Sequence, residues 1–120
     1  MGTAHRHDPT GLGRIVRNEA REFQGIVEEK DATDVQRKIT EVNMSTYVFH
    51  TPDLLAALPM MRDNNKQGEY YITDCPAILK SQGKSIRAEA VLEPCEALSV
   101  NTLEDLQAVE DEMRRLGYST

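Results

Sequence analysis

The chain has 120 residues, of which 39% are hydrophobic and 28% are charged, and its formal net charge is -6 at pH 7. This length suffices for one domain with a hydrophobic core, and the acidic balance argues against a nucleic-acid-binding surface, which needs clustered lysine and arginine. No apolar run approaches the roughly 20 residues that span a membrane. Two cysteines, Cys75 and Cys95, are too few for a disulfide framework or a zinc site. We therefore expect a reduced, cytoplasmic protein.

The N-terminal residues 1–9 are polar and lack the apolar core of a signal peptide. Within them, His5, Arg6 and His7 are predicted to form a solvated tail. The segment resembles no leader, linker or tag and runs directly into a patterned stretch. The sequence therefore leaves open whether Met1 is a true start or the chain is a fragment of a larger protein.

A β-hairpin is predicted after a turn cluster at residues 8–13. Its strands are residues 14–17 and 23–28. Asp31 or Thr33 is then expected to cap a short helix that ends near residue 38.

The strongest predicted strand covers residues 41–49, which are rich in β-branched and aromatic side chains. A helix is predicted to start with Thr51 as its cap, Pro52 at its first position and Asp53 next. Its buried face is expected to contain Leu54, Leu55, Leu58 and Met61.

Residues 67–74 (QGEYYITD) combine a glycine, which permits a tight turn, with two tyrosines that carry an apolar ring and a hydroxyl. Thr73 or Asp74 is expected to cap a helix that continues to about residue 82 and stops at Gly83. A helix start preceded by tyrosines is suited to receive a polar ligand. The same pattern also fits an ordinary corner between a loop and a helix.

The remaining elements are predicted from shorter patterns. Residues 85–92 alternate and predict a strand, residues 98–100 predict a very short strand, and a last helix begins at Asn101 or Thr102. One face of that helix is apolar and contains Leu103, Leu106, Val109, Met113 and Leu116. The alternation of strands and helices predicts an α/β fold.

Short catalytic and binding motifs are scarce in this sequence. The lone G-x-G at residues 11–13 lies before a strand instead of between a strand and a helix, so it does not fit a dinucleotide site. The sequence has no Walker loop, no H-E-x-x-H motif and no nucleophile elbow. Its histidines do not share metal-ligand spacing with the cysteines, and both cysteines are expected to be buried small apolar residues.

Several segments taken together nevertheless resemble a known family. They are residues 8–17, 25–33, 41–43, 67–74 and 99–101. Their order and spacing resemble the second half of the uridylyltransferase domain of bacterial bifunctional UDP-N-acetylglucosamine pyrophosphorylase, over about residues 8–117. The resemblance implies a single partial domain, the sugar-binding half of a Rossmann-like (glycosyltransferase-A-like) nucleotidyltransferase, with a mixed sheet and flanking helices.

The same resemblance implies a reaction and a set of site residues. The family joins UTP to N-acetylglucosamine 1-phosphate, which gives the cell-wall precursor UDP-N-acetylglucosamine and pyrophosphate. The family's sugar-binding positions correspond to Gly13, Glu28, Asn43, Tyr71 and Thr73. The position matching Asn101 holds a catalytic Mg²⁺ together with an aspartate from the first half. These residue types suit the chemistry, because a sugar needs fixed donors and acceptors beside an apolar surface and Mg²⁺ prefers oxygen ligands.

Each of these assignments has a plain structural alternative. Glu28 also fits a solvated strand end, and Tyr71 fits ordinary core packing. Asn43 also fits a local hydrogen bond to the backbone, and Asn101 fits the cap of the last helix.

The chain departs from the family pattern in two respects. The glycine-rich loop, the lysine, the uracil-binding residues and the metal-binding aspartate of the first half have no counterpart before residue 8, and the family's acyltransferase domain is absent. In addition, Met44 and Ser45 stand where Thr-Gly or a similar small pair is usual, which leaves a different sugar 1-phosphate open. We expect the chain to be inactive alone, whether its parent is a stand-alone pyrophosphorylase or it is a non-catalytic fragment. We also expect it to self-associate through surfaces that the missing half would cover.

Overall fold

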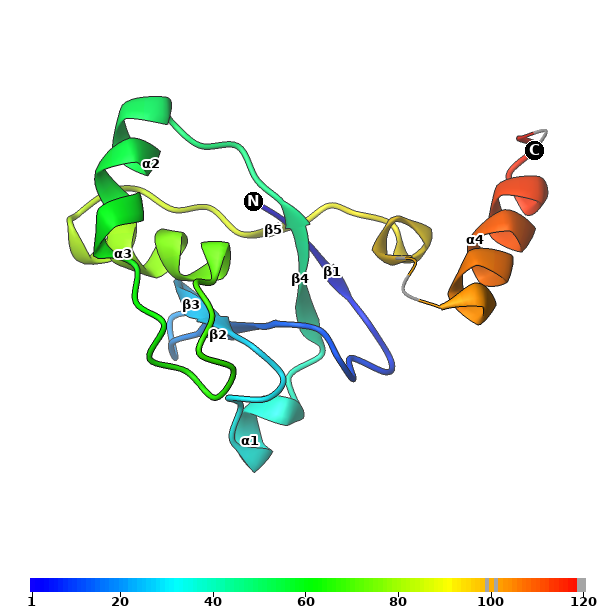
Figure 1. Cartoon of the computed structure of the whole chain (residues 1–120), viewed down its shortest axis with the longest axis horizontal. Coiled ribbons are helices and arrows are strands. Elements are labelled where there is room, and N and C mark those ends of the chain that lie inside the picture. Colours follow the sequence, from blue (N-terminus) through cyan, green and yellow to red (C-terminus); the bar gives the residue numbers. More distant parts are fainter. Residues whose placement is uncertain (99, 101, 119–120) are drawn as a thin grey trace.

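The computed structural model describes residues 1–98, 100 and 102–118. Within these residues, a mixed sheet has the strand order β3-β2-β4-β1-β5 (Figure 1). The strands are β1 (Gly2–His5), β2 (Arg14–Arg17), β3 (Phe23–Val27), β4 (Glu41–Thr46) and β5 (Glu89–Ala90). The α-helices are α1 (Asp34–Arg37), α2 (Thr51–Ala57), α3 (Cys75–Ser81) and α4 (Leu103–Arg115), and short 3₁₀ helices cover Leu58–Met60, Ile72–Asp74 and Pro94–Ala97. The predicted α/β fold with a mixed sheet and flanking helices is confirmed.

The N-terminal segment contains a strand in the interior of the sheet, so the prediction of a solvated tail at residues 5–7 was only partly right: His5 and His7 are exposed, but the segment is tied to the sheet. β1 pairs antiparallel with β4 and parallel with β5, and the side chains of Thr3 and Ala4 are buried. His5 is exposed but belongs to β1, and the backbone N–H of Arg6 donates to the carbonyl of Thr40. A strand with only two buried residues has too short an alternation to be recognised, and only the pairing with β4 buries it.

The predicted hairpin is confirmed, since β2 and β3 pair antiparallel. The predicted strand at residues 41–49 is shorter than expected, because β4 ends at Thr46. Inside β4, Ser45 has φ of 52°, in the left-handed region, and it lies where the pairing of β4 with β1 shifts register. In α1, Thr33 is the cap and forms a capping box with Gln36.

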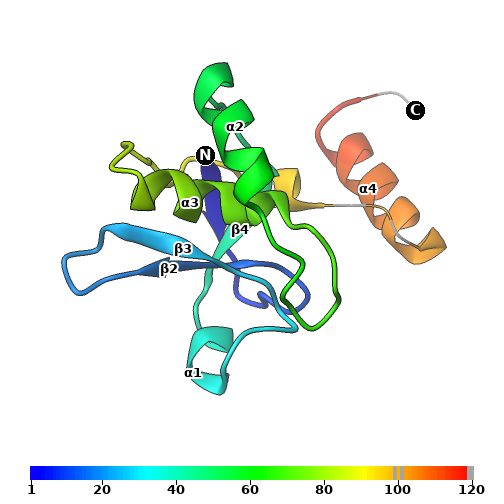
Figure 2. The same ribbon diagram turned by 60° about the vertical axis from the view of Figure 1, so that its left-hand side comes forward.

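The core lies between α2 and α3, and α3 packs on β3 (Figure 2). Its buried residues are Ala57, Met61, Cys75 and Leu79, with Phe49, Leu54, Ile78 and Ile86 packed around them. The prediction for the helix at residue 51 was only partly right. Its N-cap is His50 instead of Thr51, and on its predicted buried face Leu55 is 62% exposed and Leu58 is 41% exposed. After Ala57 the helix tightens to a 3₁₀ turn, which has fewer residues per turn than an α-helix. The side chain of Met61 is therefore buried in the core, whereas that of Leu58 is not.

The C-terminal quarter differs most from the prediction. The strand predicted at residues 85–92 is confined to β5, and Leu98 and Val100 lie outside any strand, while Ser99 lies outside the described residues. The last helix is confirmed as α4, with Thr102 as its cap in a capping box with Asp105. α4 stands apart from the sheet in both ribbon views (Figures 1 and 2).

The predicted burial of both cysteines was half right. Cys75 is buried in the core, whereas Cys95 is half-buried. Over the part of the chain that the structure describes, the helices include none long and apolar enough to cross a membrane.

Candidate functional site

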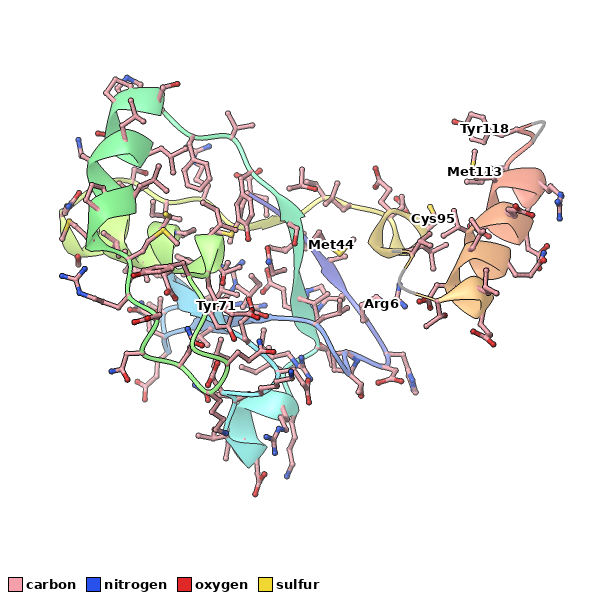
Figure 3. The ribbon with its side chains drawn as sticks, viewed as in Figure 1. Arg6, Met44, Tyr71, Cys95, Met113 and Tyr118 are labelled. Carbon is pink, nitrogen blue, oxygen red and sulfur yellow. The ribbon has the colours of Figure 1, made fainter. Side chains whose placement is uncertain are left out.

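One cleft of about 350 Å³ gathers all five residues predicted to bind a sugar. They are Gly13, Glu28, Asn43, Tyr71 and Thr73. These residues come from four segments: the turn before β2, the end of β3, β4, and the segment that leads into α3. Figure 3 shows Tyr71 on this last segment and Met44 on β4. The structure therefore brings together residues that are as much as 60 positions apart in the sequence.

Glu28 and Thr73 are joined by a hydrogen bond inside this cleft. The Thr73 hydroxyl donates to Oε1 of Glu28 at 2.9 Å, and Thr73 is 7% exposed. Asp74 is the N-cap residue of α3, as one of the two predicted candidates, but its side chain forms no cap hydrogen bond. The hydroxyl of Thr73 instead holds the carboxylate of Glu28, which is an acceptor for hydroxyl groups of a ligand.

Gly13 brings bare backbone close to the same carboxylate. A Cβ atom at this position would lie 3.1 Å from Cγ2 of Ile26 and 3.3 Å from Oε1 of Glu28, so a side chain here would crowd the cleft. The carbonyl of Gly13 accepts from the backbone N–H of Asn43 at 2.8 Å, which ties the turn before β2 to β4. Glycine at this position therefore leaves the cleft open beside Glu28.

Asn43 is anchored by two local donors. Its Oδ1 accepts from the hydroxyl of Tyr47 at 2.8 Å and from the backbone N–H of Ser45 at 3.1 Å. The local backbone hydrogen bond that the sequence left open for Asn43 is thus present, alongside its place in the cleft wall. Tyr47 is a site residue that the sequence reasoning missed, since it read this residue only as part of a strand.

Tyr71 lines both this cleft and a second one of about 450 Å³, as Glu28 and Thr73 also do. Its hydroxyl accepts from the side-chain amide of Gln67, whose carbonyl accepts from Lys30. The second cleft also contains Asp31 and Asp74. Burial, with the neighbouring charge of Asp31, raises the pKa of the Asp74 carboxyl. Tyr71 is therefore a cleft wall held by polar contacts and does not belong to the buried core.

A buried arginine supports the turn that carries Gly13. Arg14 is 1% exposed, and its guanidinium donates to the carbonyl of Leu12 and pairs with the carboxylate of Glu29. Glu29 also accepts from the backbone N–H of Gly11 at 3.3 Å, and its hydrogen bond from Arg14 lowers the pKa of the Glu29 carboxyl. The sequence reasoning missed this pair, although an arginine that opens a strand and a carboxylate next to Glu28 were visible signals.

The predicted metal ligand, Asn101, lies outside the described residues. Among the residues that are described, no group of three or more His, Cys, Asp or Glu side chains is placed to hold a metal ion.

The mixed sheet and the flanking helices place the chain in the α/β class, with the arrangement of a Rossmann-like fragment. No family model matches the chain. It is 44% identical to the bifunctional protein GlmU of Streptococcus sanguinis over 113 residues, which are 94% of this chain and 25% of that protein. It is also 44% identical to the bifunctional protein GlmU of Aquifex aeolicus over 110 residues, which are 91% of this chain and 24% of that protein.

These matches confirm the resemblance found in the sequence, and the chain is related to a segment of the bifunctional GlmU proteins. The chain spans about a quarter of the length of the curated relatives it matches. Two sequence segments that carried the resemblance, residues 8–17 and 67–74, meet at the cleft. Similarity in sequence and proximity in space therefore concern the same residues.

Proposed function

We propose that this chain forms the sugar-binding part of a sugar-1-phosphate nucleotidyltransferase. The parent reaction joins UTP to N-acetylglucosamine 1-phosphate and gives UDP-N-acetylglucosamine and pyrophosphate. The observation that carries the proposal is the single cleft that collects the five predicted sugar-binding residues in a chain related to GlmU.

The chemistry of the cleft suits a sugar. The carboxylate of Glu28 is held by Thr73 and accepts hydrogen bonds from hydroxyl groups, the bare backbone at Gly13 allows close approach, and the ring of Tyr71 offers an apolar face. A few fixed polar groups beside an apolar surface are typical of small-molecule sites. Each residue thus has a separate role in holding the sugar.

The chain is proposed to lack catalysis of its own. Nucleotidyl transfer needs an in-line arrangement and neutralised phosphate charge, which Mg²⁺ and a lysine or arginine normally provide. In the family, the phosphate-binding loop and one metal-binding aspartate come from the first half of the domain. Asn101 is proposed as the one ligand that this chain would add for Mg²⁺. Uridylyl transfer by the 120 residues alone, at the rate of a complete enzyme, would contradict this division of roles.

A different sugar 1-phosphate is the second candidate. Ser45, which stands where a glycine is usual in the family, lines the cleft and adopts the left-handed conformation that favours glycine. A serine adds a side chain to the cleft lining where a glycine would have none. Competition between N-acetylglucosamine 1-phosphate and glucose 1-phosphate for the chain separates the two substrates.

The proposal is tested by saturation-transfer NMR with UDP-N-acetylglucosamine, with and without Mg²⁺. We expect signal on the acetyl and sugar protons and none on the uracil protons. Glu28→Gln should lose most of this signal, whereas the control Glu104→Gln, on exposed α4, should keep it. Absence of signal in the wild-type chain would favour a non-catalytic fragment, and signal on uracil would mean that the chain has a nucleotide site of its own.

We also propose that the chain self-associates and acts in the cytoplasm. The apolar face of α4 is exposed and includes Leu103, Leu106, Met113 and Leu116. Exposed apolar faces of this kind favour association with another surface.

A further inference from the structure

The orientation of the Asn43 side chain is set by residues that closely follow it in the chain. Both donors to its Oδ1 come from the next four residues: the backbone N–H of Ser45 and the hydroxyl of Tyr47. An amide oxygen has two acceptor lone pairs, so these two hydrogen bonds occupy it fully. A rotated amide would place its NH₂ group against the backbone N–H of Ser45, which can only donate, so that alternative is unfavourable, and the hydroxyl of Tyr47 then holds the amide in the remaining orientation.

The backbone at Ser45 makes this arrangement possible. Its φ of 52° bends the end of β4 so that Tyr47, four residues after Asn43, turns back to reach the amide. The ring of Tyr47 stacks on Phe49, with centroids 5.5 Å apart and planes at 28°. Burial raises the pKa of Tyr47 to about 12, with a further contribution from the charge of Glu28, so the hydroxyl remains a donor at neutral pH.

The NH₂ group of Asn43 then remains for a ligand. Asn43 lines the cleft together with Glu28. Across the described residues, the only buried side-chain nitrogen or oxygen without a hydrogen-bond partner is Nε of Arg14, so Nδ2 of Asn43 is not sealed inside the protein. The cleft thus has a carboxylate acceptor at Glu28 and an amide donor at Asn43.

We infer that Tyr47 is a positioning residue of the sugar site, whose hydroxyl, with the Ser45 amide, fixes Asn43 so that its NH₂ group donates to an oxygen of the bound sugar. This inference rests on the proposed function. A sugar hydroxyl and an acetamido carbonyl are both acceptors of the required kind. Tyr47 itself has no contact with the sugar in this arrangement.

The first test needs no ligand. The side-chain ¹⁵N–¹H spectrum of the wild-type chain should show one sharp, well-separated pair of Asn43 NH₂ signals. Tyr47→Phe, which keeps the ring that stacks on Phe49, should broaden that pair or move it towards the average position. The control Tyr118→Phe removes an exposed tyrosine hydroxyl far from the cleft and should leave the pair unchanged.

The second test measures affinity for N-acetylglucosamine 1-phosphate by titration of the same three proteins and of Asn43→Asp. Tyr47→Phe should weaken binding about fivefold, as expected for the loss of one positioning hydrogen bond. Asn43→Asp still accepts from Tyr47 and Ser45 but cannot donate, so it should weaken binding more than about tenfold.

The outcomes distinguish this inference from the proposed function. The inference would be overturned if the wild-type chain binds the sugar phosphate and Tyr47→Phe changes neither the Asn43 NH₂ signals nor the affinity. The proposed function would then remain in place. A lower midpoint of thermal unfolding as the only effect of Tyr47→Phe would likewise overturn it, because a purely structural role predicts that result. Failure of the wild-type chain to bind would refute the proposed function and the donor role together, while altered NH₂ signals would still support the positioning of Asn43 by Tyr47.

Discussion

The sheet body (residues 1–92) and α4 are stabilised in different ways. In the sheet body, Glu41 accepts from Thr3 at 2.8 Å and from two nitrogens of Arg17 at 2.7 Å, which ties β1, β2 and β4 together. In α4, the ion pairs join residues three or four positions apart, as Arg114 and Arg115 do with acids of the preceding turn. Contacts between α4 and the other described helices and strands are few.

The comparison shows which part of the chain depends on its tertiary partners. The polar groups in the sheet body are buried and come from distant segments, so the loss of one leaves others without partners. The polar groups of α4 are exposed and local, and its apolar face remains open. The sheet body should therefore unfold as a unit, while α4 should fray independently.

The largest expected effect is that of Glu41→Gln. This change leaves the guanidinium of Arg17 facing an amide and weakens the link between three strands, so we expect the free energy of unfolding to fall by about 2 to 3 kcal/mol. Urea unfolding followed by fluorescence or circular dichroism measures it. The matched control is Glu112→Gln, which breaks the local pair with Arg115 on α4 and should leave the midpoint unchanged. Equal effects of the two changes would contradict the comparison.

The ion pair between Glu41 and Arg17 also predicts how the free energy of unfolding changes with pH. Burial alone would raise the pKa of the Glu41 carboxyl, but hydrogen bonds from Arg17 and Thr3 outweigh it and lower the pKa below its ordinary value of 4.5. Its stabilising effect is therefore complete above pH 4.5 and is lost as the pH falls through the folded-state pKa. The difference in unfolding free energy between the wild type and Glu41→Gln should shrink over that acid range, and a constant difference would refute this cause.

Thr73→Val tests the sheet body at the cleft. The change keeps the shape but removes the hydrogen bond to Glu28, and we expect a loss of about 1 kcal/mol in stability. The saturation-transfer signal from the sugar should fall as well, because the carboxylate is no longer held. The control Thr46→Val, at an exposed position of β4, should keep the signal. An undiminished signal in Thr73→Val would show that Glu28 needs no support from this hydroxyl.

Thr102→Ala tests α4 alone. The change removes the cap and its capping box, which stabilises a helix by about 1 kcal/mol, so the helical circular dichroism signal should fall. The amide signals of the cleft residues should stay in place, because α4 and the sheet body are nearly independent. Shifts at Glu28 or Thr73 would show that the two regions are coupled.

The smallest expected effect concerns association. Leu106 lies on the apolar face of α4 and is 40% exposed, and Leu106→Glu should move the chain towards monomers at high concentration. Light scattering across a dilution series measures the change. The control Gln107→Glu adds the same charge at the neighbouring exposed position. A chain that is monomeric before substitution would refute self-association.

Local sequence patterns predicted several elements correctly. The hairpin of β2 and β3 follows from two short apolar runs around a polar turn, and α4 follows from its cap, its amphipathic period and its stop at Gly117. The site residues came from the ordered resemblance, and the structure gathers five of the six in one cleft. The missed elements are those without a local signal, such as β1, which has only two buried residues.

The sequence by itself determined the α/β class, the caps of α1 and α4 and the segments that carry the resemblance, because these depend on residues within a few positions of each other. Only the tertiary structure decided that residues 2–5 form an interior strand, that the hydroxyl of Thr73 holds Glu28, and that Tyr47 turns back onto Asn43. Those outcomes depend on which donor meets which buried acceptor after the strands have paired. A sequence pattern shows which groups are available, and the packed fold determines their partners.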